Sequence, residues 1–425
     1  MFTSIKKRIL YFGVYIEHLF LNMTKKITKK NMQEAKNIIV VGGELFNKGA
    51  QAMSFVTIDQ IKKRFRGKNM YLFSSRDYAR SEKEKANFQF KILPWDWETK
   101  MCLFSNCLSM LLKNNRNKKD RDELNNTIKN ALFFVDVSGY ALSSDWEWTV
   151  SADYLLNIII ANKFNIPYYI FPQSFGPFDY SFKNKLQLYP LINLCMKYPR
   201  QIFAREETSM KYLSKFRKNN IFRANDILLQ VENTDLRNIY KDIPNFKKLE
   251  IEPDSVGIIP NSRVKERMNE DKFYLTYKML IKEIICCGHK VYILNHSSED
   301  SRLCARIKKI FSLNEKVELI DGDLNAIELE HIIKQFNFIV ASRYHSIVQA
   351  YKNGIPALVI GWADKYYELL NKFDQSEYFI DVRTGLNEES VKDRSERLLK
   401  LHSLEKERIK NRLLINNNIF DCLLN

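Results

Sequence analysis

Short apolar runs of strand length alternate with helix-length segments along most of the sequence, and this alternation constrains the fold most strongly. The runs are continuous stretches of Ile, Val, Leu and Phe, which is typical of strands buried on both faces. Such strands, when helices separate them, form parallel sheets. The runs predict ten strands: Ile38–Val41, Met70–Phe73, Leu132–Val137, Tyr168–Phe171, Ile202–Ala204, Val256–Ile259, Val291–Leu294, Val317–Ile320, Phe338–Ala341 and Ala357–Ile360.

A polar stretch with two prolines, Glu232–Pro253, divides these strands into two series of five. A chain of 425 residues is long enough for two such domains. We therefore predict an α/β protein with two doubly wound, Rossmann-like domains that face a cleft. The predicted parts are a basic tail (1–35), an N-terminal α/β domain (36–235), a C-terminal α/β domain (250–385) and a helical C-terminal tail (386–425).

The cysteines and the charge limit the compartment and the partners. Seven cysteines are scattered without a CxxC pair, which argues against a disulfide framework or a zinc ribbon and favours a reducing, cytosolic location. The formal net charge is +17, and residues 1–30 and 61–120 together carry +15 of it. This imbalance favours an anionic ligand or surface, either nucleic acid or a membrane face. An ordinary solvated surface is the alternative.

The N-terminal segment joins a basic start to an interrupted apolar run. Lys6–Arg8 precede Ile9–Met23, which Glu17 and His18 interrupt. The run is too short to span a bilayer and no small-residue cleavage site follows it, so we predict neither a transmembrane helix nor a signal peptide. A basic amphipathic segment on an anionic membrane surface and a solvated basic tail both fit this pattern.

Ligands of open α/β sheets bind beyond the carboxyl ends of the strands, so the residues after each strand are the candidates for a site. Ile38–Val41 is followed by a glycine-containing turn into a helix that includes Asn47 and Gln51, a place suited to an anion or a hydroxyl. The turn has neither the GxGxxG nor the Walker pattern, so no nucleotide-binding motif is predicted. A plain βα turn is the structural alternative.

The most specific segment is FIVASRYHSIVQ, residues 338–349. A strand ends at Ala341, and a helix then starts near Arg343 and His345. Cations in the first turn of a helix oppose the macrodipole, which makes sense when an anion lies there. Arg343 offers a bidentate fork for a carboxylate or phosphate, and His345 can move a proton near neutral pH. Pairing of both side chains with acids at a domain surface is the alternative.

Polar residues also follow three strands of the first series. Arg205 opens a helix after its strand, and with Arg343 it would form a clamp of two arginines across the cleft. Asp136 stands at a strand end, where it could bind a sugar hydroxyl, act as a base or cap the next loop. Gln173, in a proline-containing turn, could line the cleft.

The second series adds two polar positions but predicts no metal. His296 follows a strand and fits a structural role better than a ligand role. Asp321–Asp323 has the DxD pattern of metal-using glycosyltransferases, yet such a sequence at a strand end is more often a turn. The sequence contains no HExxH motif and no Cys/His cluster.

Four of these segments together resemble the polysaccharide pyruvyl transferase family. They are SRYHSIVQAYKNGIPALVIGW (342–362), FAREETS (203–209), PQSFGPF (172–178) and NKGAQAM (47–53). The family has a fold like that of two-domain glycosyltransferases of the B type, and its members transfer pyruvate as a ketal from phosphoenolpyruvate to two hydroxyls of a surface glycan. The resemblance implies phosphoenolpyruvate as the donor substrate, a lipid-linked glycan as the acceptor, and no cofactor or metal.

The resemblance also implies roles for individual residues. The donor-binding arginines and histidine of the family fall on Arg205, Arg343 and His345, and we add Lys365 to this set. His345 would protonate the donor methylene or help phosphate to leave, and Asp136 would take the proton of the acceptor hydroxyl. The acceptor would be bound by Asn47, Gln51, Gln173 and His296.

Two other classes of protein share part of this pattern. A nucleotide-sugar glycosyltransferase of the B type would bind a nucleoside diphosphate sugar in place of phosphoenolpyruvate. A non-catalytic basic protein would bind nucleic acid with a steep salt dependence, but it gives no reason for Arg343 and His345 to share a helix start. We expect a cytoplasmic transferase without a nucleic-acid partner, peripheral to the inner membrane face if its N-terminal segment binds there.

Overall fold

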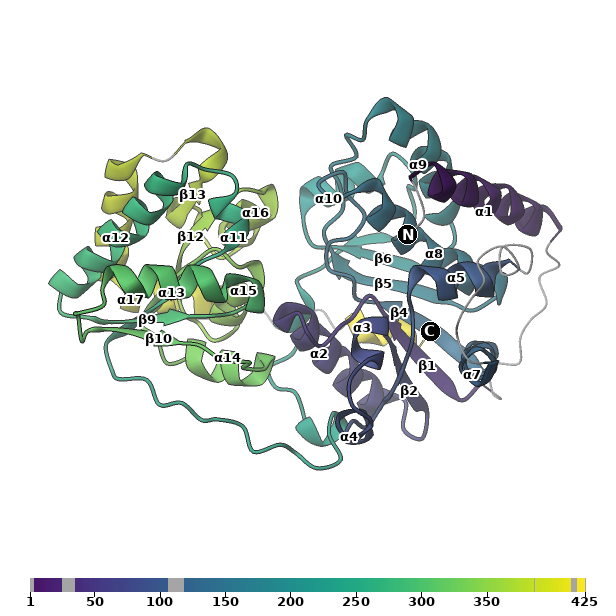
Figure 1. Cartoon of the computed structure of the whole chain (residues 1–425), viewed down its shortest axis with the longest axis horizontal. Helices are drawn as coiled ribbons and strands as arrows, with labels where there is room; N and C mark the ends of the chain where they lie inside the picture. Colours follow the sequence, from purple (N-terminus) through teal and green to yellow (C-terminus); the bar gives the residue numbers. More distant parts are fainter. Residues whose placement is uncertain (1–3, 25–34, 106–117, 386, 414–418, 425) are drawn as a thin grey trace.

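The computed structural model describes residues 4–24, 35–105, 118–385, 387–413 and 419–424. These residues form two α/β units, each built around one sheet (Figure 1). All strand pairings within the two sheets are parallel. The predicted fold class, two doubly wound parallel sheets, is confirmed.

The strands of both sheets follow the same winding pattern. The order across the first sheet is β3 (Lys91–Leu93), β2 (Asn69–Phe73), β1 (Asn37–Val41), β4 (Ala131–Asp136), β5 (Tyr168–Gln173), β6 (Gln201–Ala204) and β7 (Ile221–Arg223). The order across the second is β10 (Val317–Ile320), β9 (Lys290–Leu294), β8 (Ser255–Ile259), β11 (Phe338–Ala341), β12 (Ala357–Gly361) and β13 (Phe379–Asp381). All ten predicted strands are present, and β3, β7 and β13 are additional.

Helices cover both faces of the first sheet. Ile38 and Val40 of β1 belong to the apolar cluster that includes α2, whereas Ile39 and Val41 belong to the cluster that includes α8 and α9. This alternation follows from the two-residue period of a strand and explains why β1 is apolar throughout. The helices of this unit are α1 (Ser4–Thr24), α2 (Lys48–Arg64), α3 (Ser75–Tyr78), α4 (Glu82–Ala86), α5 (Trp97–Phe104), α7 (Lys118–Lys129), α8 (Trp148–Lys163), α9 (Phe182–Cys195) and α10 (Glu207–Leu213).

The second unit has its own set of helices around the second sheet. They are α11 (Ser262–Lys265), α12 (Glu270–Cys286), α13 (Ser301–Ile310), α14 (Ala326–Ile333), α15 (Tyr344–Lys352), α16 (Asp364–Lys372) and α17 (Glu388–Arg412). α15 follows β11 directly, so its first turn lies at the carboxyl end of that sheet. The strand–helix pair thereby presents the start of α15 to the first unit (Figure 1).

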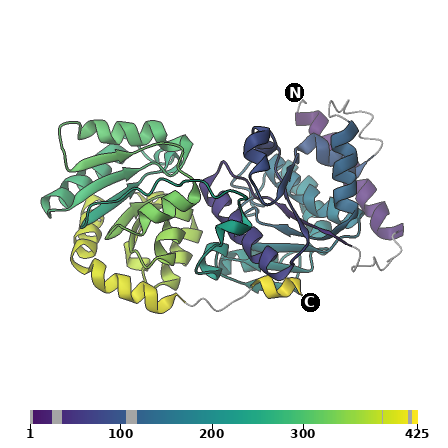
Figure 2. The ribbon, with the colours of Figure 1, turned by 90° about the horizontal axis from the view of Figure 1, so that it is seen from below.

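The chain passes between the two units twice. Residues 232–254 lead from the first unit to β8, and the short 3-10 helix η6 (Ile419–Leu423) returns to the first unit after α17 has packed on the second (Figure 2). Phe420 of η6 is fully buried, and its ring centroid lies 5.2 Å from that of Phe171 on β5. The C-terminal tail is therefore shared between the two units.

Candidate active site in the cleft between the units

The winding of each sheet reverses at one point, between β1 and β4 in the first sheet and between β8 and β11 in the second. Loops that leave the carboxyl ends of strands at such a point form a ligand-binding crevice. Both crevices open into one cleft of about 370 Å³ between the units. It is lined by 47–50 after β1, 138–140 after β4, Asn261 after β8 and Arg343 after β11, among others.

The start of α15 faces this cleft without a side-chain cap. Arg343 is the N-cap residue, and within the described chain its side chain makes no capping hydrogen bond. Its guanidinium is instead directed to acids, because Nε donates to Asp300 Oδ2 at 2.6 Å and Nη2 donates to Glu299 Oε2 at 3.2 Å. A helix start without a side-chain cap and with a neighbouring arginine is a favourable place for an anion.

Basic side chains outnumber carboxylates in the lining of the cleft, and four of them also form ion pairs with acids: Lys48 with Asp323, Arg205 with Asp226, Arg263 with Glu266 and Arg343 with Asp300. The described residues that line it include five basic side chains and a single carboxylate, that of Glu299. Lys48 and Arg205 come from the first unit, and Arg263, Arg343 and Lys365 come from the second. Low-dielectric walls of one sign of charge concentrate ligands of the opposite sign. The arrangement therefore favours a small, multiply charged anion that contacts both units.

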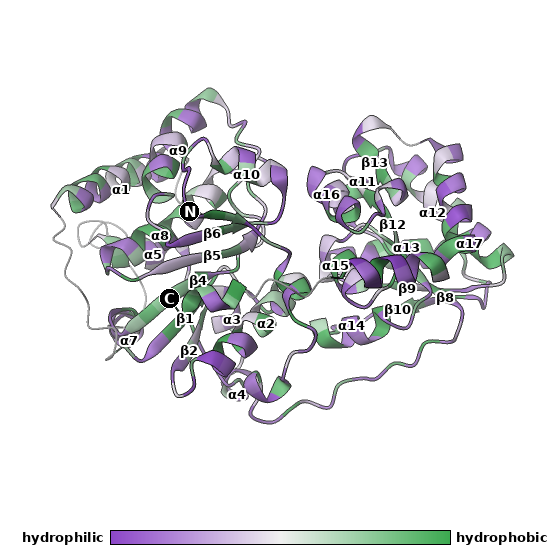
Figure 3. Ribbon diagram, turned by 180° about the vertical axis from the view of Figure 1, so that it is seen from behind, coloured by the Kyte–Doolittle hydropathy of each residue, from purple (hydrophilic) through white to green (hydrophobic). Residues whose placement is uncertain are grey.

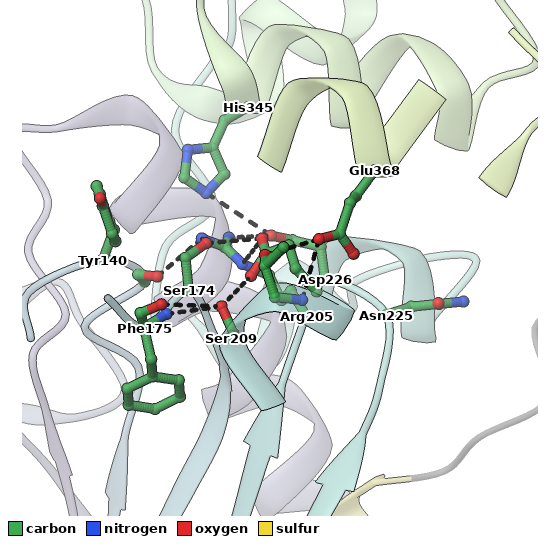
Figure 4. Close-up of polar contacts among 12 residues, drawn as sticks. Tyr140, Ser174, Phe175, Arg205, Ser209, Asn225, Asp226, His345 and Glu368 are labelled. Carbon is green, nitrogen blue, oxygen red and sulfur yellow. Dashed lines mark hydrogen bonds and ion pairs between the residues drawn. The ribbon is translucent and has the colours of Figure 1, made fainter. Parts of the chain in front are cut away.

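Arg205 is held rigidly at the base of the cleft. Its Nη1 donates to Asp226 Oδ2 at 2.6 Å, and its Nη2 donates to the Gly139 carbonyl and to Ser174 Oγ, both at 2.7 Å (Figure 4). The guanidinium carbon lies 4.8 Å from the ring centroid of Tyr344, which belongs to the second unit. Arg205 and Arg343 thus line the same cleft from opposite units, while their action as a clamp remains a prediction.

His345 lies where the two units meet. Its Nε2 is 4.0 Å from Asp226 Oδ2, and this nitrogen has no hydrogen-bond partner in the described part of the protein (Figure 4). Burial lowers the pKa of His345 to about 3, although the nearby Asp226 acts in the opposite direction. The imidazole is therefore neutral at pH 7. A Cβ atom on Gly49 would lie 2.2 Å from Nδ1 of this ring, so the contact needs a glycine.

Lys365, on α16 of the second unit, lies near aromatic rings of both units. Its Nζ lies 4.4 Å from the ring centroid of Tyr140 and 5.4 Å from that of Tyr344. Burial and the charge of Arg205 lower the pKa of Lys365 to about 8. The ammonium is thus charged at pH 7 but close to its titration range.

Asp136 and Gln173 do not reach the cleft. The Asp136 carboxylate is fully buried: Oδ1 accepts from the Ser138 backbone N–H at 2.9 Å and from Gln173 Nε2 at 3.1 Å, and Oδ2 accepts from the Tyr168 hydroxyl. Burial also raises the pKa of Asp136. The prediction that Asp136 takes a proton from the acceptor is corrected accordingly, because the carboxylate is enclosed and holds the loop after β4. Gln173 is fully buried beside it and cannot contact an acceptor.

The remaining predicted acceptor residues have other partners. Asn47 lines the cleft and caps α2 with its side-chain oxygen. Gln51 is buried, and its Oε1 accepts from the Ala326 N–H at 2.8 Å, so it joins the two units instead of facing an acceptor. His296 lines the cleft, but its Nε2 lies 3.1 Å from Gln349 Oε1, and burial lowers its pKa to about 4.

A second cavity, of about 560 Å³, adjoins the cleft. The two share Tyr140, Trp362 and Lys365. Aromatic rings offer flat apolar faces, and carboxylates accept hydrogen bonds from hydroxyls. The cavity combines both kinds of group: Tyr140, Phe175, Tyr212, Trp362, Asp145, Asp179, Glu206 and Asp364.

Both carboxylates of the DxD sequence accept hydrogen bonds from other side chains of the protein. Asp321 Oδ1 accepts from Asn295 Nδ2 at 2.6 Å, and Asp323 Oδ1 accepts from Lys48 Nζ at 2.5 Å across the cleft. Among the residues with described positions, no group of three or more His, Cys, Asp or Glu side chains is arranged to hold a metal ion. The expectation of a metal-free site stays a prediction.

Two Rossmann-like units that meet at a cation-lined cleft define a two-domain protein of the B-type glycosyltransferase fold. Solved structures of this architecture include S. aureus MnaA with UDP (12% identity, 88% of this chain and 91% of that chain covered, TM-score 0.53). UDP-GlcNAc 2-epimerases of Neisseria meningitidis bound to UDP-GlcNAc (13%, 91% and 99%, 0.52) and of Methanocaldococcus jannaschii (13%, 85% and 92%, 0.50) are further examples. At these identities the similarity concerns the fold alone.

The family is defined by the sequence. The model of the polysaccharide pyruvyl transferase family matches residues 47–364, most of the chain. The chain belongs to this family and is a transferase, which confirms the predicted resemblance. No curated protein matches the sequence at a significant level.

Proposed function

We propose that the enzyme transfers an enolpyruvate-derived group from phosphoenolpyruvate to a sugar of a cell-surface polysaccharide or its lipid-linked precursor, in the cytoplasm. One observation carries this proposal: five basic side chains from both units line the same cleft as the uncapped start of α15. Phosphoenolpyruvate carries a phosphate and a carboxylate, so it can pair with cations on both walls at once. The family match supports the same donor class.

The donor would bind with its phosphate at the start of α15. Arg343 and the start of this helix suit a phosphate, and Lys365, on α16 of the same unit, suits the carboxylate. Arg205 already donates a hydrogen bond to Asp226, so its guanidinium would contribute positive charge from a fixed position. The acceptor sugar would occupy the adjoining cavity, whose border with the cleft at Tyr140 brings a hydroxyl close to the donor.

Two residues of the cleft have the protonation states that ketal formation needs. Lys365 keeps its proton at pH 7 and would donate it to the methylene carbon of the donor. At the same time an acceptor hydroxyl would add to the neighbouring carbon of the donor and give its proton to neutral His345. The C–O bond to phosphate then breaks. Phosphate leaves with the bonding electrons and the proton of His345. A second hydroxyl adds to the same carbon and returns a proton to Lys365.

This assignment reverses the predicted role of His345 from acid to base. The reason is burial, which keeps the imidazole neutral before the donor arrives. Asp226, 4.0 Å away, would stabilise the imidazolium that forms during the reaction. All protons are accounted for in this scheme. The proton of the first hydroxyl passes through His345 to phosphate, and the proton of the second replaces the one that Lys365 gave to the new methyl group.

The direct test is phosphate release from phosphoenolpyruvate in the presence of lipid-linked glycans, together with calorimetric binding of the donor alone. Arg343→Ala should weaken donor binding about ten- to a hundredfold, because a charge-assisted pair is lost. Arg343→Lys, which keeps a charge beside Asp300, controls for misfolding, and Arg306→Ala on exposed α13 should bind normally. Binding of a UDP-sugar in place of phosphoenolpyruvate would instead support a nucleotide-sugar glycosyltransferase.

The affinity for phosphoenolpyruvate should fall as the pH rises through about 8, the pKa to which burial lowers Lys365. Above this pH the amine is neutral and no longer attracts the donor, whose phosphate is already fully ionised because its second pKa is about 6. Calorimetric titrations from neutral to alkaline pH measure the effect. Lys365→Arg is permanently charged and should keep the affinity constant; the same fall in this variant would assign the titration to another group.

A further inference from the structure

Helix α1 carries two separate apolar faces. Tyr11, Val14 and His18 are buried where α1 packs on α8 and α9. Arg8 fixes this position, since its guanidinium donates to Asn184 Oδ1 of α9 at 2.7 Å and lies 4.6 Å from the Trp148 ring centroid of α8. One apolar face is therefore enough to attach the helix to the first unit.

The second apolar face of α1 points to solvent. Five large side chains on it are between 36% and 81% exposed, and no part of the chain that the structure describes covers them. Their spacings of three and four residues place them within one stripe along the helix. We call this set the outer stripe: Ile9, Phe12, Ile16, Phe20 and Met23. Figure 3 shows the hydrophobic character of α1 at the surface of the first unit.

The charge of the N-terminal sequence indicates what covers the outer stripe. Residues 1–30 contain seven Lys or Arg and one acid, Glu17. Two copies of such a segment would repel each other, whereas an anionic lipid surface attracts both the charge and the apolar stripe. None of the helices in the described residues has the length and apolar character of a membrane span.

We propose that α1 docks the enzyme on an anionic membrane surface. The helix would lie in the plane of the interface, with the outer stripe among the acyl chains and Lys6, at the start of the helix, near the headgroups. The buried face of α1 would keep its contacts with α8 and α9. Docking therefore requires no rearrangement of the first unit and does not depend on the reaction that the cleft catalyses.

Co-sedimentation with vesicles of phosphatidylglycerol and phosphatidylcholine tests the proposal on the full chain. The variant Ile9→Ser/Phe12→Ser/Phe20→Ser should reduce vesicle binding at least about tenfold, because it removes three apolar side chains from the interface. The matched control is Leu275→Ser/Leu313→Ser/Leu404→Ser, three leucines of the second unit that are similarly exposed. This control should bind as the wild type does.

The salt and lipid dependence of vesicle binding and the oligomeric state of the protein distinguish the other possible outcomes. Binding of the wild type should decrease with rising salt and should be much weaker to vesicles of phosphatidylcholine alone. Equal binding of the serine variant, or no binding of the wild type to anionic vesicles, would overturn the proposal. A wild-type dimer that the same variant converts to a monomer, without vesicle binding, would show that the stripe is an interface between two copies of the chain.

Discussion

His345→Gln is expected to lower the turnover of phosphoenolpyruvate and acceptor by about 10²–10⁴-fold, the usual contribution of a general acid or base. Glutamine keeps the size and polarity of the side chain but cannot accept and release a proton. Because Lys365 and Arg343 remain, binding of the donor should stay within a few-fold of the wild type. The variant therefore separates proton transfer from anion binding in the same cleft.

Single-turnover phosphate release and calorimetric donor binding measure the two quantities independently. His402→Gln, on α17 outside the cleft lining, is the matched control and should retain wild-type values for both. If His345→Gln turns over normally, the base lies elsewhere, and Tyr344 becomes the next candidate. If donor binding is lost as well, His345 contributes mainly to binding.

Gly49→Ala is expected to lower turnover by about a hundredfold or more, although it removes no functional group. The new Cβ atom would lie 2.2 Å from Nδ1 and 2.9 Å from Cβ of His345, so the stem of the histidine has no room to rotate away. Either the imidazole leaves its place or the two units move apart. Alanine is otherwise favourable inside a helix such as α2, by about 1 kcal/mol over glycine, so a loss of activity cannot come from helix propensity.

The comparison with Gly13→Ala isolates the steric effect. Gly13 lies within α1, and no atom lies within 4 Å of a Cβ placed there. Gly13→Ala should therefore retain activity toward a water-soluble acceptor analogue, while Gly49→Ala should lose it. Small-angle scattering should report a larger radius for Gly49→Ala if the units separate. Wild-type activity in Gly49→Ala would mean that the contact between Gly49 and His345 is not part of the working cleft.

The central strands were predictable because they are buried on both faces and read as continuous apolar runs. The three strands that were missed, β3, β7 and β13, have three residues each and lie at sheet edges. An edge strand is partly solvated, so its sequence loses the continuous apolar signal. Ile221–Arg223 illustrates this, since two of its three residues are exposed.

The rule that ligands bind beyond the carboxyl ends of parallel strands predicted part of the site. That rule placed six of the chosen side chains at the cleft: Asn47, Arg205, His296, Arg343, His345 and Lys365. It fails for Asp136 and Gln173, because each is the last residue of its strand and still faces the neighbouring strand. It also fails for Gln51, which is buried and bonds to Ala326 of the second unit. Asp226 was missed because it follows β7, a strand without a sequence signal, although it pairs with Arg205 and lies 4.0 Å from His345 Nε2.

The double passage of the chain between the units restricts how the cleft can open. The burial of Phe420 under β5 keeps the second connection attached. The C-terminal segment thereby attaches to the first unit after α17 has packed on the second, so a wide opening of the cleft has to displace either η6 from β5 or α17 from its unit. Release of η6 would remove this second attachment between the units.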